Sequence, residues 1–154
     1  MVHCYYREIE EVECEWEGNP EDLARHLVNS HGIFSHSSCK HNKFALELMM
    51  DPESYGFRFV VLDFNKISCI FEEYFDEDTE LVSVLLRAPE RVNYKIKLHG
   101  AKSSLEYEGT TQVFEDPSIE DNSNCLQVHE KQLFQFCHLV DNERRYKVIL
   151  MLKD

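Results

Sequence analysis

The sequence predicts a mainly β protein, an antiparallel sandwich preceded by a short helical segment. Two observations carry this prediction. From residue 44 onward, short apolar segments follow one another closely and are separated by turn-forming residues. The stretches between them are too short for the crossover helices that a parallel sheet needs. We therefore expect seven or eight strands joined by hairpin-like turns, in two packed sheets.

The helical segment lies near the N-terminus. The Pro20-Glu21-Asp22 string is typical of a helix start, and the apolar Leu23 and Leu27 follow at helical spacing. We expect a helix from about Glu21 to Ser30. One or two further helical turns are expected within residues 129–138.

The clearest strand covers residues 92–98. Apolar Val92, Tyr94, Ile96 and Leu98 alternate there with polar residues, so one face is expected in the core and the other in water. The other segments with an apolar or extended pattern are 44–50, 55–64, 67–75, 81–86, 104–108, 111–114, 125–128 and 145–152, and residues 115–124 are expected to form an acidic loop.

A cysteine before the expected helix and two histidines on it form the pattern C-x-W-x-G followed by H-x4-H. Cys14 precedes the helix, and His26 and His31 lie on it at a spacing that lets both imidazoles face one point. Cys4 supplies a fourth ligand, which completes a tetrahedral Cys2His2 set for structural Zn²⁺. The alternative is a chance pair of histidines on an exposed helix. Catalytic zinc is disfavoured because no H-E-x-x-H motif is present.

Charge and composition exclude several classes of function. The chain has 154 residues and a net charge of −13, which argues against nucleic-acid binding by phosphate neutralisation. No apolar run long enough for a membrane span and no secretory signal are visible. The six cysteines are not spaced as a disulfide framework, so we expect a reducing compartment, the cytoplasm, with the nucleus as a second location.

Several other groups of residues have alternative interpretations. Cys39 and its neighbouring histidines form either a second metal cluster or a polar loop, and we favour the loop. The acidic strings Glu72-Glu73, 76–78 and 115–116 are expected to be solvated rather than cation or basic-partner sites. Cys69 and Cys125 are expected to be buried, and Phe57, Phe59 and Phe64 to be core residues. No nucleophile elbow, P-loop or G-x-G-x-x-G motif is present, so we expect no intrinsic catalysis.

A series of segments, found in the same order along most of the chain, resembles the seven-in-absentia (SINA/SIAH) family of ubiquitin ligases. The similarity begins with Cys14-Glu15-Trp16-Glu17-Gly18, His26-Leu27 and His31. It continues through Met49-Met50, residues 55–62, 94–100, 122–126 and 132–134, and the final strand. No RING domain and no first zinc finger of that family lie in this sequence. The chain is thus either part of a longer ligase or a RING-less adaptor.

The resemblance implies a specific architecture and role. It implies a zinc finger over residues 1–34 and a TRAF-like, eight-stranded antiparallel sandwich over residues 42–154. In the family this second domain forms homodimers and binds substrate proteins through short extended peptides at a sheet edge. The expected function is therefore a protein-interaction module of the ubiquitin pathway. The alternative is a homodimeric scaffold outside ubiquitin transfer.

The sequence departs from the family pattern where the peptide would bind. By resemblance, the peptide-binding segment is Leu46, Glu47, Leu48 and Met49, and Glu47 occupies a position where the family has a tryptophan. The segment between His31 and Met49 is also shorter than in the family. Glu47 is expected either to select a basic residue or to close the groove.

Overall fold

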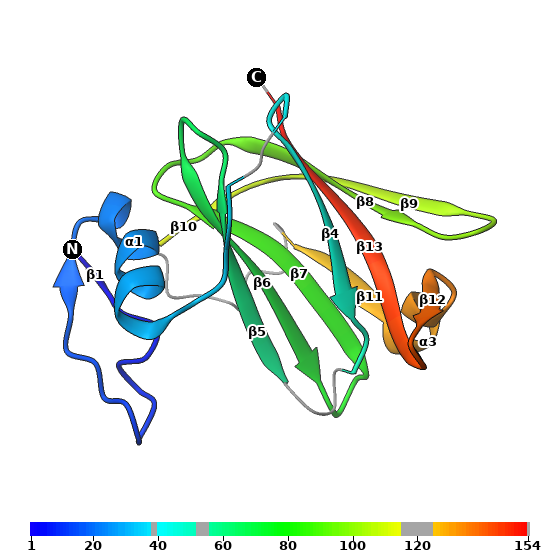
Figure 1. Cartoon of the computed structure of the whole chain (residues 1–154), viewed down its shortest axis with the longest axis horizontal. Coiled ribbons are helices and arrows are strands. Elements are labelled where there is room, and N and C mark those ends of the chain that lie inside the picture. Colours follow the sequence, from blue (N-terminus) through cyan, green and yellow to red (C-terminus); the bar gives the residue numbers. More distant parts are fainter. Residues whose placement is uncertain (38–39, 52–55, 115–124, 154) are drawn as a thin grey trace.

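The computed structural model describes residues 1–37, 40–51, 56–114 and 125–153, and they form a mainly β fold. A small head at the N-terminus lies beside a larger body made of two sheets (Figure 1). Within the described residues, no helix is long and apolar enough to cross a membrane. Cys39 and the expected acidic loop at 115–124 lie outside the described residues.

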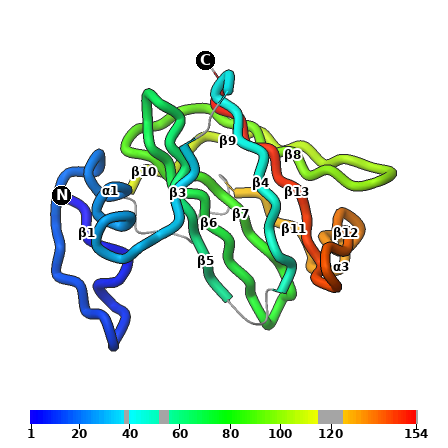
Figure 2. The backbone as a smooth tube through the Cα atoms, viewed as in Figure 1, coloured from blue at the N-terminus to red at the C-terminus, as the bar shows by residue number. Residues whose placement is uncertain are grey.

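The head contains one helix and a small sheet. The helix α1 (Pro20–His31) extends the predicted helix by one residue at each end. Strands β1 (Val2–His3) and β2 (Glu17–Gly18) pair antiparallel in front of it. Figure 2 shows the chain leaving α1 and joining the body through β3 (Ser35–His36), which pairs with an edge of the first sheet.

The first sheet of the body carries the head. Its central strands pair in the order β7-β6-β5, with β3 beside β5, and both β10 and β11 beside β7. The strands span β5 (Phe57–Asp63), β6 (Ser68–Asp76), β7 (Leu81–Ala88), β10 (Gln112–Val113) and β11 (Leu126–His129).

The second sheet is built around the C-terminal strand. Strand β13 pairs with β4 along one edge, and with β8 and β12 along the other; β9 pairs with β8. The bounds are β4 (Lys43–Met49), β8 (Asn93–His99), β9 (Ser104–Thr110), β12 (Cys137–Val140) and β13 (Glu143–Leu152). The short helix α3 (Glu130–Phe134) precedes β12.

One hydrophobic core lies between the two sheets. The predicted alternation in β8 is confirmed, because Tyr94, Ile96 and Leu98 are fully buried while their neighbours are not. They pack with residues of the first sheet such as Leu62 and Phe71. Burial of this area is the main stabilising contribution to such a fold.

The strand count differs from the prediction. Eleven strands, β3 to β13, form the body, where seven or eight were expected; with β1 and β2 of the head, the described residues contain thirteen strands. Four of them (β1, β2, β3 and β10) have only two residues, which is too short to leave a periodic pattern in the sequence. Within residues 129–138, where one or two helical turns were expected, α3 is helical, but Cys137 and His138 begin strand β12. The pairs β3–β5 and β10–β7 are parallel, unlike the rest of the body.

Two expectations about burial are wrong. Glu72 and Glu73 are each 1% exposed rather than solvated. They point to opposite faces of β6, and each is neutralised by an arginine. Arg87 Nε lies 2.6 Å from Glu72, and Arg58 Nε lies 2.7 Å from Glu73. Phe64 is buried as predicted, but Phe57 is 38% exposed on the outer face of its sheet.

Candidate metal centre

Helix α1 positions the two histidines. Pro20 opens the helix, and Leu23, Ala24 and Leu27 form its buried face. His31 lies in the last turn, which ends at Gly32 with a left-handed φ of 64°. The Gly32 N–H donates to the carbonyl of Val28, and the Ile33 N–H donates to the carbonyl of Leu27. A left-handed residue at this point is the usual helix end, and glycine adopts it without a steric penalty.

A folded loop brings Cys14 to Cys4. The Cys14 N–H donates to the carbonyl of Tyr6, and the Cys4 N–H donates to the carbonyl of Trp16. These two bonds close residues 6–14 into a compact loop, which we call the knuckle. The Tyr6 N–H also donates to the Cys4 sulfur at 3.4 Å, an orientation that favours a charged thiolate.

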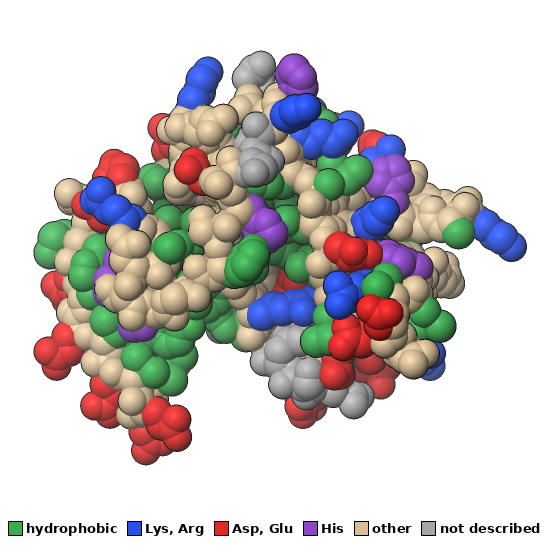
Figure 3. Space-filling view, in the orientation of Figure 1, with side chains coloured by type: hydrophobic (Ala, Val, Ile, Leu, Met, Phe, Trp, Pro, Cys, Tyr) green, Lys and Arg blue, Asp and Glu red, His purple; other side chains and the backbone are tan. Residues whose placement is uncertain are grey.

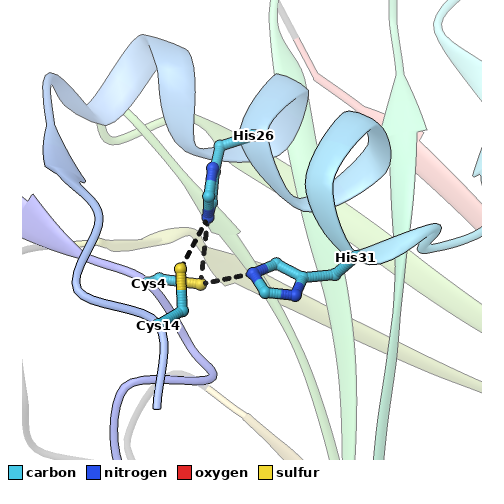
Figure 4. A group of neighbouring side chains, drawn as sticks. All are labelled: Cys4, Cys14, His26 and His31. Carbon is cyan, nitrogen blue, oxygen red and sulfur yellow. Dashed lines mark hydrogen bonds between the residues drawn. The ribbon is translucent and has the colours of Figure 1, made fainter. Parts of the chain in front are cut away.

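The four side chains converge on one point (Figure 4). His26 Nε2 lies 3.2 Å from Cys4 Sγ and 3.5 Å from Cys14 Sγ, and His31 Nε2 lies 3.3 Å from Cys4 Sγ. All four ligand atoms lie within 4.8 Å of one another. The predicted ligands therefore come together in an arrangement that can hold a metal ion.

Aromatic rings fix the orientation of both imidazoles. Trp16 stacks on His26, with ring centroids 4.5 Å apart and an angle of 10°, and Tyr6 stacks on His31 at 4.3 Å. A Cβ atom at Gly18 would overlap the Trp16 ring. This contact explains the C-x-W-x-G pattern, because the tryptophan covers a histidine and the glycine leaves room for the tryptophan.

The pKa values of the Cys4 thiol and the His26 imidazole are also consistent with a bound metal cation. Burial raises the pKa of the Cys4 thiol to about 11, so a nearby positive charge is needed to hold it as a thiolate at neutral pH. Burial, and then the charge of His31, lower the pKa of His26. A neutral imidazole is the form that binds metal.

The metal centre is packed directly against the first sheet. Cys4, Leu23 and Leu27 share a hydrophobic cluster with Val61 of β5 and Ile70 of β6. Beside this cluster, the Tyr5 hydroxyl donates to Glu72 at 3.1 Å, next to the buried Glu72–Arg87 ion pair. Burial raises the pKa of Glu72, and Arg87 opposes that effect.

The predicted peptide-binding residues divide between the two faces of β4. Leu46 and Leu48 lie on the core side, whereas Glu47 and Met49 lie on the outer face; Met49 is 41% exposed. Leu46 is buried and Leu48 is half-buried. Glu47 Oε1 contacts His138 Nε2 of β12 and lies in register with Lys147 of β13.

Sequence reasoning missed the residues that surround and support the metal ligands without being ligands themselves. Tyr6 and Tyr5 carry no spacing pattern, and Glu72 and Arg87 are partners on neighbouring strands. A single signal was present: two adjacent glutamates inside an apolar strand, which is unfavourable unless both are paired.

No family model and no curated protein matches this sequence. The resemblance to the seven-in-absentia family remains a prediction.

Proposed function

We propose that the protein is a zinc-stabilised protein-interaction module, similar to the substrate-binding region of seven-in-absentia ubiquitin ligases. Its TRAF-like body would capture extended segments of partner proteins along a sheet edge. The observation that carries the proposal is the Cys4, Cys14, His26 and His31 cluster, packed onto a sandwich with an open edge at β4.

Zinc is the metal that best suits the ligand set. Two thiolates and two imidazoles are a common structural zinc site, with Zn–S near 2.3 Å and Zn–N about 2.0–2.1 Å. A tetrahedron with those bonds has sulfur–nitrogen edges of about 3.6 Å. Three of the four sulfur–nitrogen distances, at 3.2, 3.3 and 3.5 Å, lie close to that value. With four protein ligands the site has no open position, which favours a structural role.

An open strand edge supports the binding of an extended peptide. Among the described strands, β13 is the only one that pairs with β4, so the other edge of β4 offers backbone donors and acceptors. A peptide strand added there would be held by main-chain hydrogen bonds, and side chains would set specificity. Glu47 and Met49 flank that edge on the outer face.

The resemblance supports two versions of this function. In one, the module delivers substrates to a ubiquitin ligase; in the other, it is a homodimeric adaptor outside ubiquitin transfer. Both versions rest on capture of a protein segment and neither needs catalysis by this chain. The Glu47 carboxylate favours a peptide with a basic residue near the point where the family's tryptophan would lie.

Selection from a random twelve-residue peptide display library on the full chain tests the proposal. Peptides that bind the wild type should lose about tenfold in affinity for Glu47→Lys, because the reversed charge repels a basic residue. The matched control is Glu106→Lys on β9 of the same sheet, which should bind as the wild type does. Failure to select any peptide, or equal binding by both variants, would contradict the proposed site.

A further inference from the structure

The outer face of the first sheet carries a row of aromatic rings beside the metal-binding head. Phe57 is stacked against Tyr74 at 4.5 Å and against Phe59 at 5.3 Å between ring centroids. We call these three residues the aromatic strip. Phe59 in turn contacts Tyr5 and Tyr6 of the head at 5.0 and 6.1 Å. The strip therefore runs from the end of the sheet to the base of the knuckle.

The strip is open to solvent at the end farthest from the head–body contact. Phe59 and Tyr74 are half-buried, and Phe57 is 38% exposed. Burial of a phenylalanine is normally a main source of stability, so an exposed and stacked one is a candidate contact for another molecule.

Acidic segments border the strip on two sides. The knuckle carries four exposed glutamates, Glu8, Glu10, Glu11 and Glu13. The end of β6 and the turn that joins it to β7 carry four more exposed acidic residues: Asp76, the last residue of β6, and Glu77, Asp78 and Glu80 of the turn. In Figure 3 acidic side chains form the lower tip of the head, and hydrophobic side chains lie directly above them.

The arginines of these same elements are already paired with other carboxylates. Arg7 of the knuckle contacts Glu17, Arg58 of β5 turns inward to Glu73, and Arg87 of β7 is buried with Glu72. Of the acidic residues in the turn, Glu80 contacts His129 at 3.2 Å. The surface around the strip thus keeps a strong negative charge, which attracts cations from solution.

We propose that the aromatic strip and its acidic borders dock a positively charged segment of a partner protein. Arginine or lysine side chains would lie over the ring faces, where cation–π attraction acts, and their charged ends would reach the carboxylates. The aliphatic part of the same side chains would cover Phe57. This surface lies on the sheet opposite β4, so the inference stands apart from the peptide site proposed above.

Fluorescence anisotropy of two labelled peptides tests the docking surface on the full chain. One peptide alternates arginine and leucine, and the other alternates glutamate and leucine at the same length. The arginine peptide should bind and the glutamate peptide should not. Binding should weaken as salt rises from about 0.05 M to about 0.3 M, because part of the attraction is screened.

Variants separate the aromatic and acidic contributions. Phe57→Ser should weaken binding of the arginine peptide about five- to tenfold, and Phe57→Tyr should retain it, because a ring remains.

A triple change at the knuckle (E8Q, E10Q and E13Q) should weaken binding of the arginine peptide and flatten its salt dependence. The matched control (E106Q, E108Q and E143Q) alters net charge equally on the other sheet and should bind as the wild type does. Glu47→Lys should also leave this binding intact, so the two proposed sites can fail separately.

Three results would overturn the docking surface. The first is equal binding by the wild type and Phe57→Ser, with circular dichroism showing both folded. The second is an equal loss for the knuckle triple and its control, which would show general charge attraction. The third is self-association by light scattering that Phe57→Ser abolishes, without binding of the arginine peptide; a second copy of the chain would then cover the strip.

Discussion

Single residues in the head have roles that depend on one another. The Cys4 and Cys14 sulfurs meet two imidazoles whose orientation is fixed by the stacked rings of Trp16 and Tyr6. A ring that covers a ligand restricts its rotation, so less conformational entropy is lost when a metal binds. The metal site is therefore sensitive to changes at residues that do not bind the ion.

Gly18 provides a direct test of this dependence. Gly18→Ala adds a Cβ that overlaps the Trp16 ring, so the ring must move away from His26. We expect a loss of about 1–3 kcal/mol in the free energy of unfolding, typical of overpacking, and weaker metal binding. Urea unfolding and competition with a chelator measure the two effects.

The control is the same change in a Trp16→Leu background. There the smaller side chain leaves room for a methyl group, so Gly18→Ala should cost much less than in the wild type. An equal cost in both backgrounds would show that Trp16 is not what restricts residue 18.

At the scale of elements, periodic segments were predictable and paired charges were not. The limits of α1 and the inward face of β8 follow from the spacing of their apolar residues. The burial of Glu72 depends on Arg87, which the pairing of β6 with the next strand, β7, brings beside it. Local sequence contains no information on that partner, so the glutamate was expected in solvent.

Helix α1 connects the metal centre to the body through its buried face. Leu27 is fully buried against the cluster that includes Val61 and Ile70. Leu27→Ala should cost about 2–5 kcal/mol in the free energy of unfolding, because it removes buried methyl groups and leaves a cavity. Urea unfolding followed by far-ultraviolet circular dichroism measures it.

The control on the same helix is Arg25→Ala. Arg25 is exposed and contacts only Asp22 within its own helix among the ion pairs of the described residues, so its loss should change stability by about 0.5 kcal/mol or less. Similar stabilities for the two variants would mean that α1 is not anchored to the sheet through Leu27.

At the scale of the whole molecule, the head and body are joined by a continuous contact. The hydrophobic cluster around Val61 and Ile70 contains residues from both parts, and Tyr5 adds a polar link to Glu72. The sequence indicated two regions, 1–34 and 42–154, because the pattern changes from helical to extended. It did not indicate that the head covers one face of the sheet, since that depends on side chains far apart in the chain.

The candidate metal ligands were predictable because they combine a local helical spacing with residue types of known chemistry. The aromatic strip was not, because Phe57 lies in an apolar run where burial was the natural expectation. The strand alternation placed it on the outer face, and the head covers only part of that face. The two proposed binding surfaces thus lie on different sheets of the same fold.

Metal content per chain tests the central claim most directly. The purified wild type, dialysed and analysed by inductively coupled plasma mass spectrometry, should contain one zinc per chain. Cys14→Ser and His26→Ala should lose the metal and unfold the head, because binding of a structural metal is coupled to folding. A control change at Cys69, a buried cysteine outside the cluster, should retain it. A wild type without zinc, or variants that keep it, would contradict the account.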